Sequence, residues 1–258
     1  MARIPLPPDF LRLPLAHRGF HDRAAGRIEN SLSAIRAAIA VGYGIEIDLQ
    51  LSSDGVPMVF HDDALDRLTS ETGPVRARTA ETLTGIRLQG SNDTIPTFAQ
   101  VLALVAGRVP LLVELKAPSP TMSDTDENLE SASAAALHGY RGPVALMSFN
   151  PHAVAHLARL APLLPRGLTT SAYDPDDWHP LPPAACARLR EIPDYDRTQS
   201  SFISHEAADL SFRPRVTELK AQGAKILCWT IRSPAAEAQA RRIAQNITFE
   251  SYPAAFPA

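Results

Sequence analysis

Two carboxylates stand two residues apart in an otherwise apolar stretch, Ile45-Glu46-Ile47-Asp48-Leu49. Side chains of a β-strand alternate between its two faces, so Glu46 and Asp48 share one face and the apolar residues share the other. If the apolar face packs on helices, both carboxylates point into the fold, where like charges require a cation or a raised pKa. The alternative is an edge strand whose acidic residues face solvent.

A histidine follows this strand after a turn. The segment Ser53-Asp54-Gly55 is typical of a tight turn, and the apolar residues 56–60 come after it. If Asp54-Gly55 forms a two-residue hairpin turn, His61 lies directly opposite Asp48. A lone histidine before Asp62 is more often structural, but a histidine facing a carboxylate pair is a candidate general acid or base.

A second strand has the same design. In Leu112-Val113-Glu114-Leu115-Lys116, the apolar residues share one face, and Glu114 and Lys116 share the other. Such a pair is usually a surface ion pair. Beside Glu46 and Asp48 it would instead supply a third carboxylate for a hard divalent cation and a positive charge for an anionic substrate.

The first predicted strand ends in His17-Arg18-Gly19, at the edge where barrel active sites lie. The guanidinium of Arg18 suits a phosphate, and Gly19 permits a sharp turn. His17 and His21 have the spacing of a helical zinc pair, but Gly19 and the strand context argue against that helix, so we discount zinc. Trp229, at the end of a later strand, lines a pocket or packs in the core; the sequence favours neither.

Short apolar runs that alternate with helical segments must position these residues. Strands are predicted at residues 13–16, 44–51, 56–60, 111–115, 144–147, 167–170, 202–204, 225–230 and 246–249. Helix starts are marked by Asn30 or Ser31, by Thr97 with Gln100 three residues later, and by Asn150-Pro151 and Ser233-Pro234. This order predicts a (β/α)8 TIM-type barrel with one β-hairpin, and a doubly wound open sheet is the competing fold.

The whole chain, residues 1–258, is expected to form a single barrel domain. Two segments interrupt its rhythm. Residues 62–94 are polar and irregular and suggest a small insertion at the rim of the barrel. Residues 171–200 are rich in proline and carry Trp178; they form either an ordinary surface loop or a wall of the site.

Composition limits the possible partners. A formal net charge of −3 gives no electrostatic basis for binding nucleic acid or an anionic membrane. Prolines and an aspartate replace the apolar core of a signal peptide, and no apolar run is long enough to span a membrane. With only Cys186 and Cys228 and no disulfide framework, a cytoplasmic location is expected, and the oligomeric state is not predicted.

Taken together, these motifs resemble the glycerophosphodiester phosphodiesterase family. The resemblance rests on ordered segments that cover most of the chain: His17-Arg18-Gly19, Glu29-Asn30-Ser31, Glu46-x-Asp48, Asp54-Gly55, His61-Asp62, Leu65-Asp66-Arg67 with Thr69, Glu114-Leu115-Lys116 and Trp229-Thr230. Two positions depart from the family pattern. Ile28 replaces a proline, and the run ending in Glu250 replaces one ending in Thr-Asp, so Glu250 is assigned no role.

The resemblance implies a phospholipase-C-like barrel. Glu46, Asp48 and Glu114 would hold one divalent cation, Mg²⁺ or Ca²⁺, and His17 and His61 would be the acid–base pair. Two cationic residues would neutralise the phosphate and one aromatic residue would contact the substrate; these are Arg18, Lys116 and Trp229.

The predicted function is metal-dependent hydrolysis of small glycerophosphodiesters to an alcohol and sn-glycerol 3-phosphate, with a cyclic phosphate as one route. Two alternatives stay open. One is a lipid phosphodiesterase of the lysophospholipase D or sphingomyelinase D kind, which would need an apolar rim such as the Pro-rich segment. The other is a phosphate-binding module without catalysis.

Overall fold

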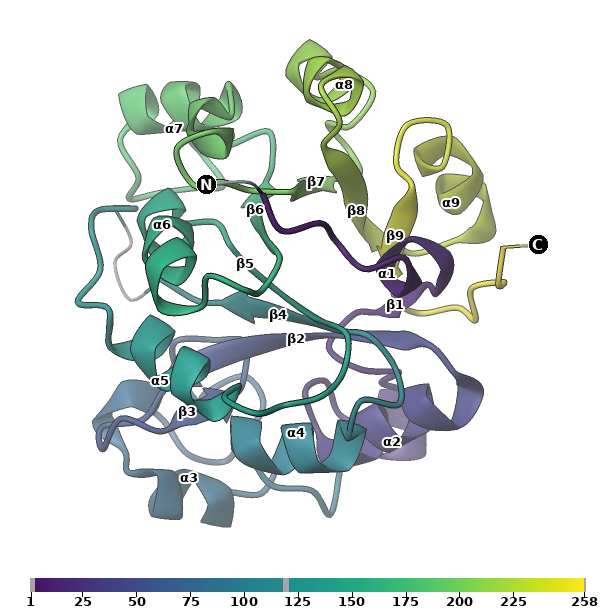
Figure 1. Cartoon of the computed structure of the whole chain (residues 1–258). Helices are drawn as coiled ribbons and strands as arrows, with labels where there is room; N and C mark the ends of the chain where they lie inside the picture. Colours follow the sequence, from purple (N-terminus) through teal and green to yellow (C-terminus); the bar gives the residue numbers. More distant parts are fainter. Residues whose placement is uncertain (1–2, 118–120, 258) are drawn as a thin grey trace.

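Eight parallel strands close into a barrel in the computed structural model, which describes residues 3–117 and 121–257 (Figure 1). The sheet order β1-β9-β8-β7-β6-β5-β4-β2 returns to its start because β1 also pairs with β2. The barrel strands are β1 (Leu15–Ala16), β2 (Gly44–Leu51), β4 (Leu111–Leu115), β5 (Val144–Ser148), β6 (Arg166–Thr170), β7 (Phe202–Glu206), β8 (Lys225–Ile231) and β9 (Asn246–Phe249). Closure confirms the predicted (β/α)8 barrel and excludes the open sheet.

Helices connect consecutive barrel strands and surround the sheet (Figure 1). They are α2 (Leu32–Val41), α4 (Phe98–Val105), α5 (Asn128–Ala136), α6 (Pro151–Leu160), α7 (Pro183–Arg190), α8 (Pro214–Ala221) and α9 (Pro234–Ala240). The predicted starts are confirmed. Ser31, Asn150 and Ser233 cap α2, α6 and α9 with their side chains, and Thr97 with Gln100 forms a capping box on α4.

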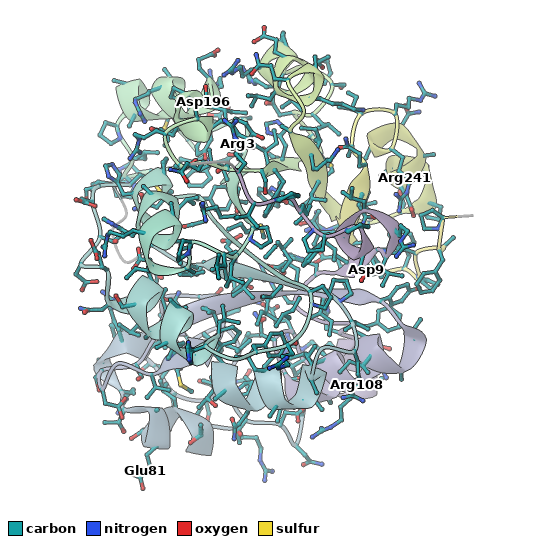
Figure 2. All side chains as sticks on the ribbon, viewed as in Figure 1. Arg3, Asp9, Glu81, Arg108, Asp196 and Arg241 are labelled. Carbon is teal, nitrogen blue, oxygen red and sulfur yellow. The ribbon has the colours of Figure 1, made fainter. Side chains whose placement is uncertain are left out.

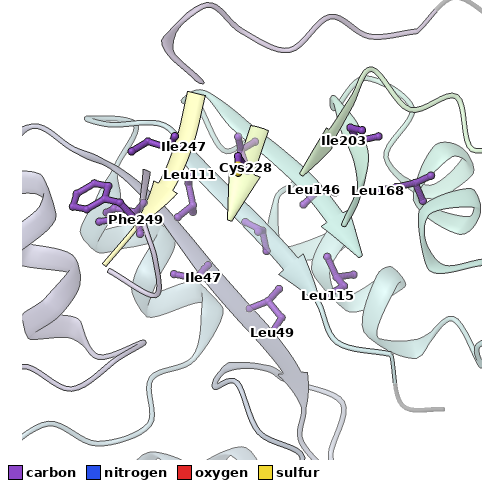
Figure 3. Packing of buried hydrophobic residues seen from close by; sticks show 14 of the residues in the cluster. Ile47, Leu49, Leu111, Leu115, Leu146, Leu168, Ile203, Cys228, Ile247 and Phe249 are labelled. Atoms are coloured by element: carbon purple, nitrogen blue, oxygen red, sulfur yellow. The ribbon is translucent and has the colours of Figure 1, made fainter. Parts of the chain in front are cut away.

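The main hydrophobic core lies between the barrel strands and these helices. Figure 3 shows its members projecting from several strands, among them Ile47, Leu49, Leu111, Leu115, Leu146, Leu168, Ile203, Cys228, Ile247 and Phe249. Ile47 and Leu49 flank Asp48, so burial of their side chains turns the intervening carboxylate to the barrel interior. Packing of the core thereby determines that Glu46 and Asp48 point into the barrel.

A smaller apolar cluster fills the amino-terminal end of the barrel interior. Phe10, in the short helix α1 (Asp9–Arg12), packs there with Leu112, Phe202 and Leu227, all near the starts of their strands. Asn246 Nδ2 donates hydrogen bonds to two carbonyl oxygens of the same N-terminal segment, at 2.8 and 2.7 Å. This apolar cluster closes the amino-terminal end of the barrel, so a functional site is expected at the carboxyl ends of the strands, as in other barrels.

The hairpin after β2 differs from its prediction. β3 (Pro57–Val59) pairs antiparallel with the end of β2, but the turn contains three residues, because Ser52 and Val56 are joined by a backbone hydrogen bond. Gly55 takes the left-handed conformation that a three-residue turn requires, with φ 81°. The amide of Phe60, not of His61, therefore donates to the Asp48 carbonyl, so the predicted register is wrong by one residue.

Residues 62–94 have a hydrophobic cluster of their own beside the hairpin. Leu65, Leu68, Leu83 and Leu88 pack there with Met58 of β3. The segment includes η2 (Val75–Ala77) and α3 (Ala80–Gly85), and another short turn of helix, η1 (Arg23–Ala25), lies between β1 and α2. The irregular sequence thus folds as an apolar cluster around short helical turns.

The Pro-rich segment 171–200 is more ordered than a plain loop. It contains α7 and η3 (Pro193–Tyr195), with Pro183 at the start of α7, where a missing N–H costs nothing. Arg3 pairs with Asp196 and lies over the ring of Tyr195, 4.8 Å from its centroid, and Figure 2 shows Arg3 and Asp196 together. The irregular residues before α1 thereby connect this segment to the barrel.

In the part of the chain that is described, no helix combines the length and the apolar character needed to cross a membrane.

Candidate active site

Three buried carboxylates meet at the carboxyl ends of β2 and β4. Asp48 pairs in register with Glu114, and Glu46 precedes Asp48 on the same face. Their exposed fractions are 2% for Glu46, 1% for Asp48 and 6% for Glu114. One oxygen of each lies within 4.8 Å of the others, and among residues 3–117 and 121–257 this is the group able to hold a metal ion.

The electrostatics of this trio favour a bound cation. Burial, and then the charges of Asp48 and Glu114, raise the pKa of Glu46 well above its usual value. An oxygen-only donor set of this kind suits a hard cation such as Mg²⁺ or Ca²⁺ and does not suit zinc. The donor chemistry therefore fits the predicted ion class.

Two cationic side chains lie against the carboxylates. Lys116 Nζ is 2.8 Å from Asp48 Oδ1 and 2.6 Å from Glu114 Oε1, and Arg18 Nε is 3.3 Å from Asp48 Oδ2. Burial opposes ionisation of Asp48, but Lys116 and then other nearby cationic groups hold its pKa well below the usual range. The same carboxylates raise the pKa of Lys116 although burial alone would lower it. Lys116 therefore carries its charge at neutral pH.

The turn after β1 explains the position of Arg18. Gly19 has φ 81°, and a Cβ there would lie 3.0 Å from α2, so the turn requires glycine. The Arg18 carbonyl accepts a hydrogen bond from the amide of Asn30, whose Nδ2 donates to Asp48 at 2.9 Å. Arg18 Nη1 donates to Glu29 at 2.7 Å. Glu29 thus holds the guanidinium of Arg18 in place, and Asn30 holds the carboxylate of Asp48. The sequence pointed to Glu29 and Asn30 only as part of the family resemblance.

His17 stands directly after β1 and is held by Glu250. Its Nδ1 lies 2.5 Å from Glu250 Oε2, and its Nε2 lies 4.0 Å from Glu46 Oε2. Burial lowers the pKa of His17, and the hydrogen bond with Glu250 opposes that shift. Glu250 also accepts from Arg232 Nε at 2.7 Å.

The sequence assigned no role to Glu250, but the structure places its carboxylate on His17. In the closed barrel Ala16 pairs with Phe249, so the residues that follow them, His17 and Glu250, become neighbours. They are far apart in sequence, and only closure of the barrel joins them.

His61 is held by its neighbour Asp62 in the way that His17 is held by Glu250. His61 Nδ1 lies 2.6 Å from Asp62 Oδ1, and Arg67 Nε donates to Asp62 Oδ2 at 2.6 Å. Burial would raise the pKa of Asp62, but the hydrogen bonds from His61 and Arg67 hold it well below its usual value. Arg67 also donates twice to Glu29, at 2.7 and 2.8 Å. The segment 62–94 is thereby joined to the same network as Arg18.

All eight side chains singled out from the sequence line one cavity of about 590 Å³. They are His17, Arg18, Glu46, Asp48, His61, Glu114, Lys116 and Trp229. The indole N–H of Trp229 donates to the Ser204 carbonyl at 3.0 Å, and the residue forms part of the cavity wall. Phe149, which directly follows β5, also lines the cavity, although no motif in the sequence marks it. Trp178 lines it too, from the Pro-rich segment for which the sequence left both a surface loop and a wall of the site open.

A family model described as the glycerophosphoryl diester phosphodiesterase family matches residues 17–248. The chain belongs to this family. It is an enzyme of the phosphodiesterase class, as the sequence predicted, and its barrel is the fold of the solved members.

Relatives from this family support the assignment. The chain is 30% identical over 175 residues to a glycerophosphodiester phosphodiesterase from Caldanaerobacter subterraneus subsp. tengcongensis, which covers 65% of this chain and 70% of the relative. An Oleispira antarctica phosphodiesterase, solved with the product sn-glycerol-3-phosphate, superposes with a TM-score of 0.75 and 26% identity, over 95% of this chain and 94% of that one. A glycerophosphodiester phosphodiesterase from Parabacteroides distasonis shares the fold with a TM-score of 0.72 and 20% identity, over 97% and 94% of the two chains.

Proposed function

We propose that this protein hydrolyses glycerophosphodiesters to an alcohol and sn-glycerol 3-phosphate, with one divalent cation held by Glu46, Asp48 and Glu114. His17 and His61 would be the acid–base pair. The observation that carries the proposal is that each histidine has a carboxylate on Nδ1 and lines the same cavity as the three buried carboxylates. The product bound to the Oleispira antarctica relative supports the same substrate class.

Neutralising the phosphate is the first task of such a site. A phosphodiester at neutral pH carries one negative charge, which repels an attacking oxygen. Arg18 and Lys116 both line the cavity and place positive charge beside it. A bound Mg²⁺ or Ca²⁺ would add Lewis-acid stabilisation of charge on the phosphorus oxygens.

Moving two protons is the second task. A carboxylate that accepts from Nδ1 fixes the tautomer of each imidazole and leaves Nε2 for the reactants. One histidine would take a proton from the attacking oxygen, and the other would give a proton to the leaving alcohol.

The glycerol 2-hydroxyl is the nearest nucleophile in such a substrate. Its oxygen would form a bond to phosphorus as the bond to the alcohol breaks, giving a cyclic phosphate. Water would then open the ring, with the roles of His17 and His61 exchanged. Phosphorus NMR during turnover tests this route, because direct attack by water gives sn-glycerol 3-phosphate without a cyclic species.

Release of sn-glycerol 3-phosphate from glycerophosphocholine and glycerophosphoethanolamine tests the function itself. The protein would be stripped of metal and then supplied with Mg²⁺, Ca²⁺ or Mn²⁺. We expect metal-dependent release, and losses on the order of 10² to 10⁴ in rate for His17→Asn and His61→Asn. The matched control is His152→Asn on the outer helix α6, where the side chain is 41% exposed and turnover should not change.

Two results would overturn the proposal. Faster choline release from lysophosphatidylcholine than from glycerophosphocholine would assign the site to lipids. Binding of the diesters without release, in a folded and metal-loaded sample, would assign it to a binding module.

The same proposal includes location and partners. Cys186 and Cys228 are buried and free, which is compatible with the reducing cytoplasm. The partner is a small diester, since the net charge of −3 offers no basis for nucleic acid.

A further inference from the structure

The cavity has two unlike halves. The half built from β1 to β4 carries the histidines, the buried carboxylates and the cations already described. The other half is apolar and is contributed by loops after β4, β5 and β6 and by β8; its members are Met122, Phe149, Trp178, Pro180 and Trp229. A diester with its phosphate at the polar half must place one of its two arms against the apolar half.

Ring contacts fix the apolar half in place. The ring centroid of Phe149 lies 4.9 Å from that of Trp178 and 5.5 Å from that of Trp229, both in edge-to-face geometry. Trp178 also packs on Tyr173, with 4.8 Å between ring centroids. Because these rings come from three separate elements and support one another, the wall exists before a ligand binds, and little ordering is required on binding.

A carboxylate accompanies the wall. Asp177, next to Trp178, lines the same cavity and is exposed, and within the described residues its carboxylate has no hydrogen bond or ion pair. An aromatic surface with an adjacent free carboxylate is the chemistry that recognises an organic cation.

The charge of the whole cavity points the same way. Of the described residues that line it, six are carboxylates and two are permanent cations; the carboxylates are Glu46, Asp48, Asp62, Asp63, Glu114 and Asp177, and the cations are Arg18 and Lys116. One divalent cation leaves this lining negative. A diester with a positive alcohol arm enters as a neutral zwitterion, whereas a diester with an uncharged or anionic arm adds negative charge to a negative site.

We propose that the half formed by Phe149, Trp178, Trp229 and Asp177 is the subsite for the alcohol arm and selects a quaternary ammonium alcohol. A quaternary ammonium group has no N–H, so aromatic faces and one carboxylate satisfy it fully. A primary ammonium group needs three hydrogen-bond acceptors and is served less well. The inference rests on the proposed function and adds the class of alcohol.

The test compares kcat/KM for glycerophosphocholine, glycerophosphoethanolamine and glycerophosphoglycerol, measured as sn-glycerol 3-phosphate release. We expect the wild type to prefer the three in that order, with roughly ten-fold between the first and the last. Asp177→Asn and Trp178→Leu should each lower kcat/KM for glycerophosphocholine towards that for glycerophosphoglycerol, so that most of the roughly ten-fold preference is lost. The matched control is Asp176→Asn, an exposed carboxylate of the same turn that does not line the cavity and should change nothing.

Equal kcat/KM for the three diesters in the wild type would overturn the inference and leave the proposed function intact. So would loss of all three activities in equal proportion in Asp177→Asn, which alters only an exposed side chain. Absence of release from every diester would instead refute the proposed function, on which the subsite depends.

Discussion

Replacing Glu250 with glutamine tests whether the carboxylate on His17 supports the reaction. Glutamine has the same shape and still accepts a hydrogen bond, but it carries no charge to stabilise a protonated imidazole. The carboxylate lies 2.5 Å from His17 Nδ1 in a partly buried site, where a hydrogen bond to a charged group is worth about 1.5–3 kcal/mol. At about 1.4 kcal/mol per factor of ten, Glu250→Gln should lower kcat/KM by roughly 10- to 150-fold.

The assay is sn-glycerol 3-phosphate release from glycerophosphocholine at saturating metal, with kcat and KM determined separately. Because Glu250 contacts His17 and does not itself line the cavity, the loss should fall on kcat, with KM little changed. Arg232→Ala is the matched control, since it removes an ion pair of Glu250 that comes from a side chain 63% exposed and leaves the contact with His17 in place. Its effect should be less than about three-fold.

Turnover of Glu250→Gln within two-fold of the wild type would refute this reasoning. An equal loss in Arg232→Ala would also refute it, because the effect would then belong to the exposed ion pair and not to the hydrogen bond on His17.

Further predictions concern stability and metal binding. Gly167→Ala would place a Cβ 2.5 Å from the ring of Phe202, so urea denaturation should show a loss of about 1–3 kcal/mol. In the control Gly85→Ala, at the end of α3, the new Cβ has no atom within 4 Å and alanine is the better helix former, so the protein should be unchanged or more stable by up to about 1 kcal/mol. Mg²⁺ or Ca²⁺ at about a hundred times its dissociation constant should add about 2.7 kcal/mol to the stability of the metal-stripped protein, and Glu114→Gln should abolish the rise in Tm. Burial lowers the pKa of His205 to about 4, so the unfolded chain binds its proton first, and stability present above about pH 6.5 is lost as the pH falls towards 4. Between pH 8 and pH 5 the loss should be about 2 kcal/mol, and His205→Asn should show a shallower pH dependence in urea titrations; an unchanged slope would contradict the assignment.

The sequence by itself determined the features that depend on neighbouring residues. Alternation along residues 45–49 placed Glu46 and Asp48 on one face, and the caps at Ser31 and Thr97 fixed where helices begin. These features can be predicted from the sequence because strand periodicity and helix capping depend on only a few neighbouring residues. The resemblance extended the same local motifs to the family, and a family model bears it out.

Only the tertiary structure decided contacts between distant segments. His17 meets Glu250 because β1 pairs with β9 when the barrel closes, and no local pattern encodes that closure. The hairpin turn has three residues and not the predicted two, and the left-handed conformation of Gly55 stabilises it. The extra residue shifts the register of the hairpin by one. Phe149 and Trp178 converge from different loops, where side-chain direction follows packing and not periodicity. Local sequence thus supplied the reactive groups, and barrel closure set their partners.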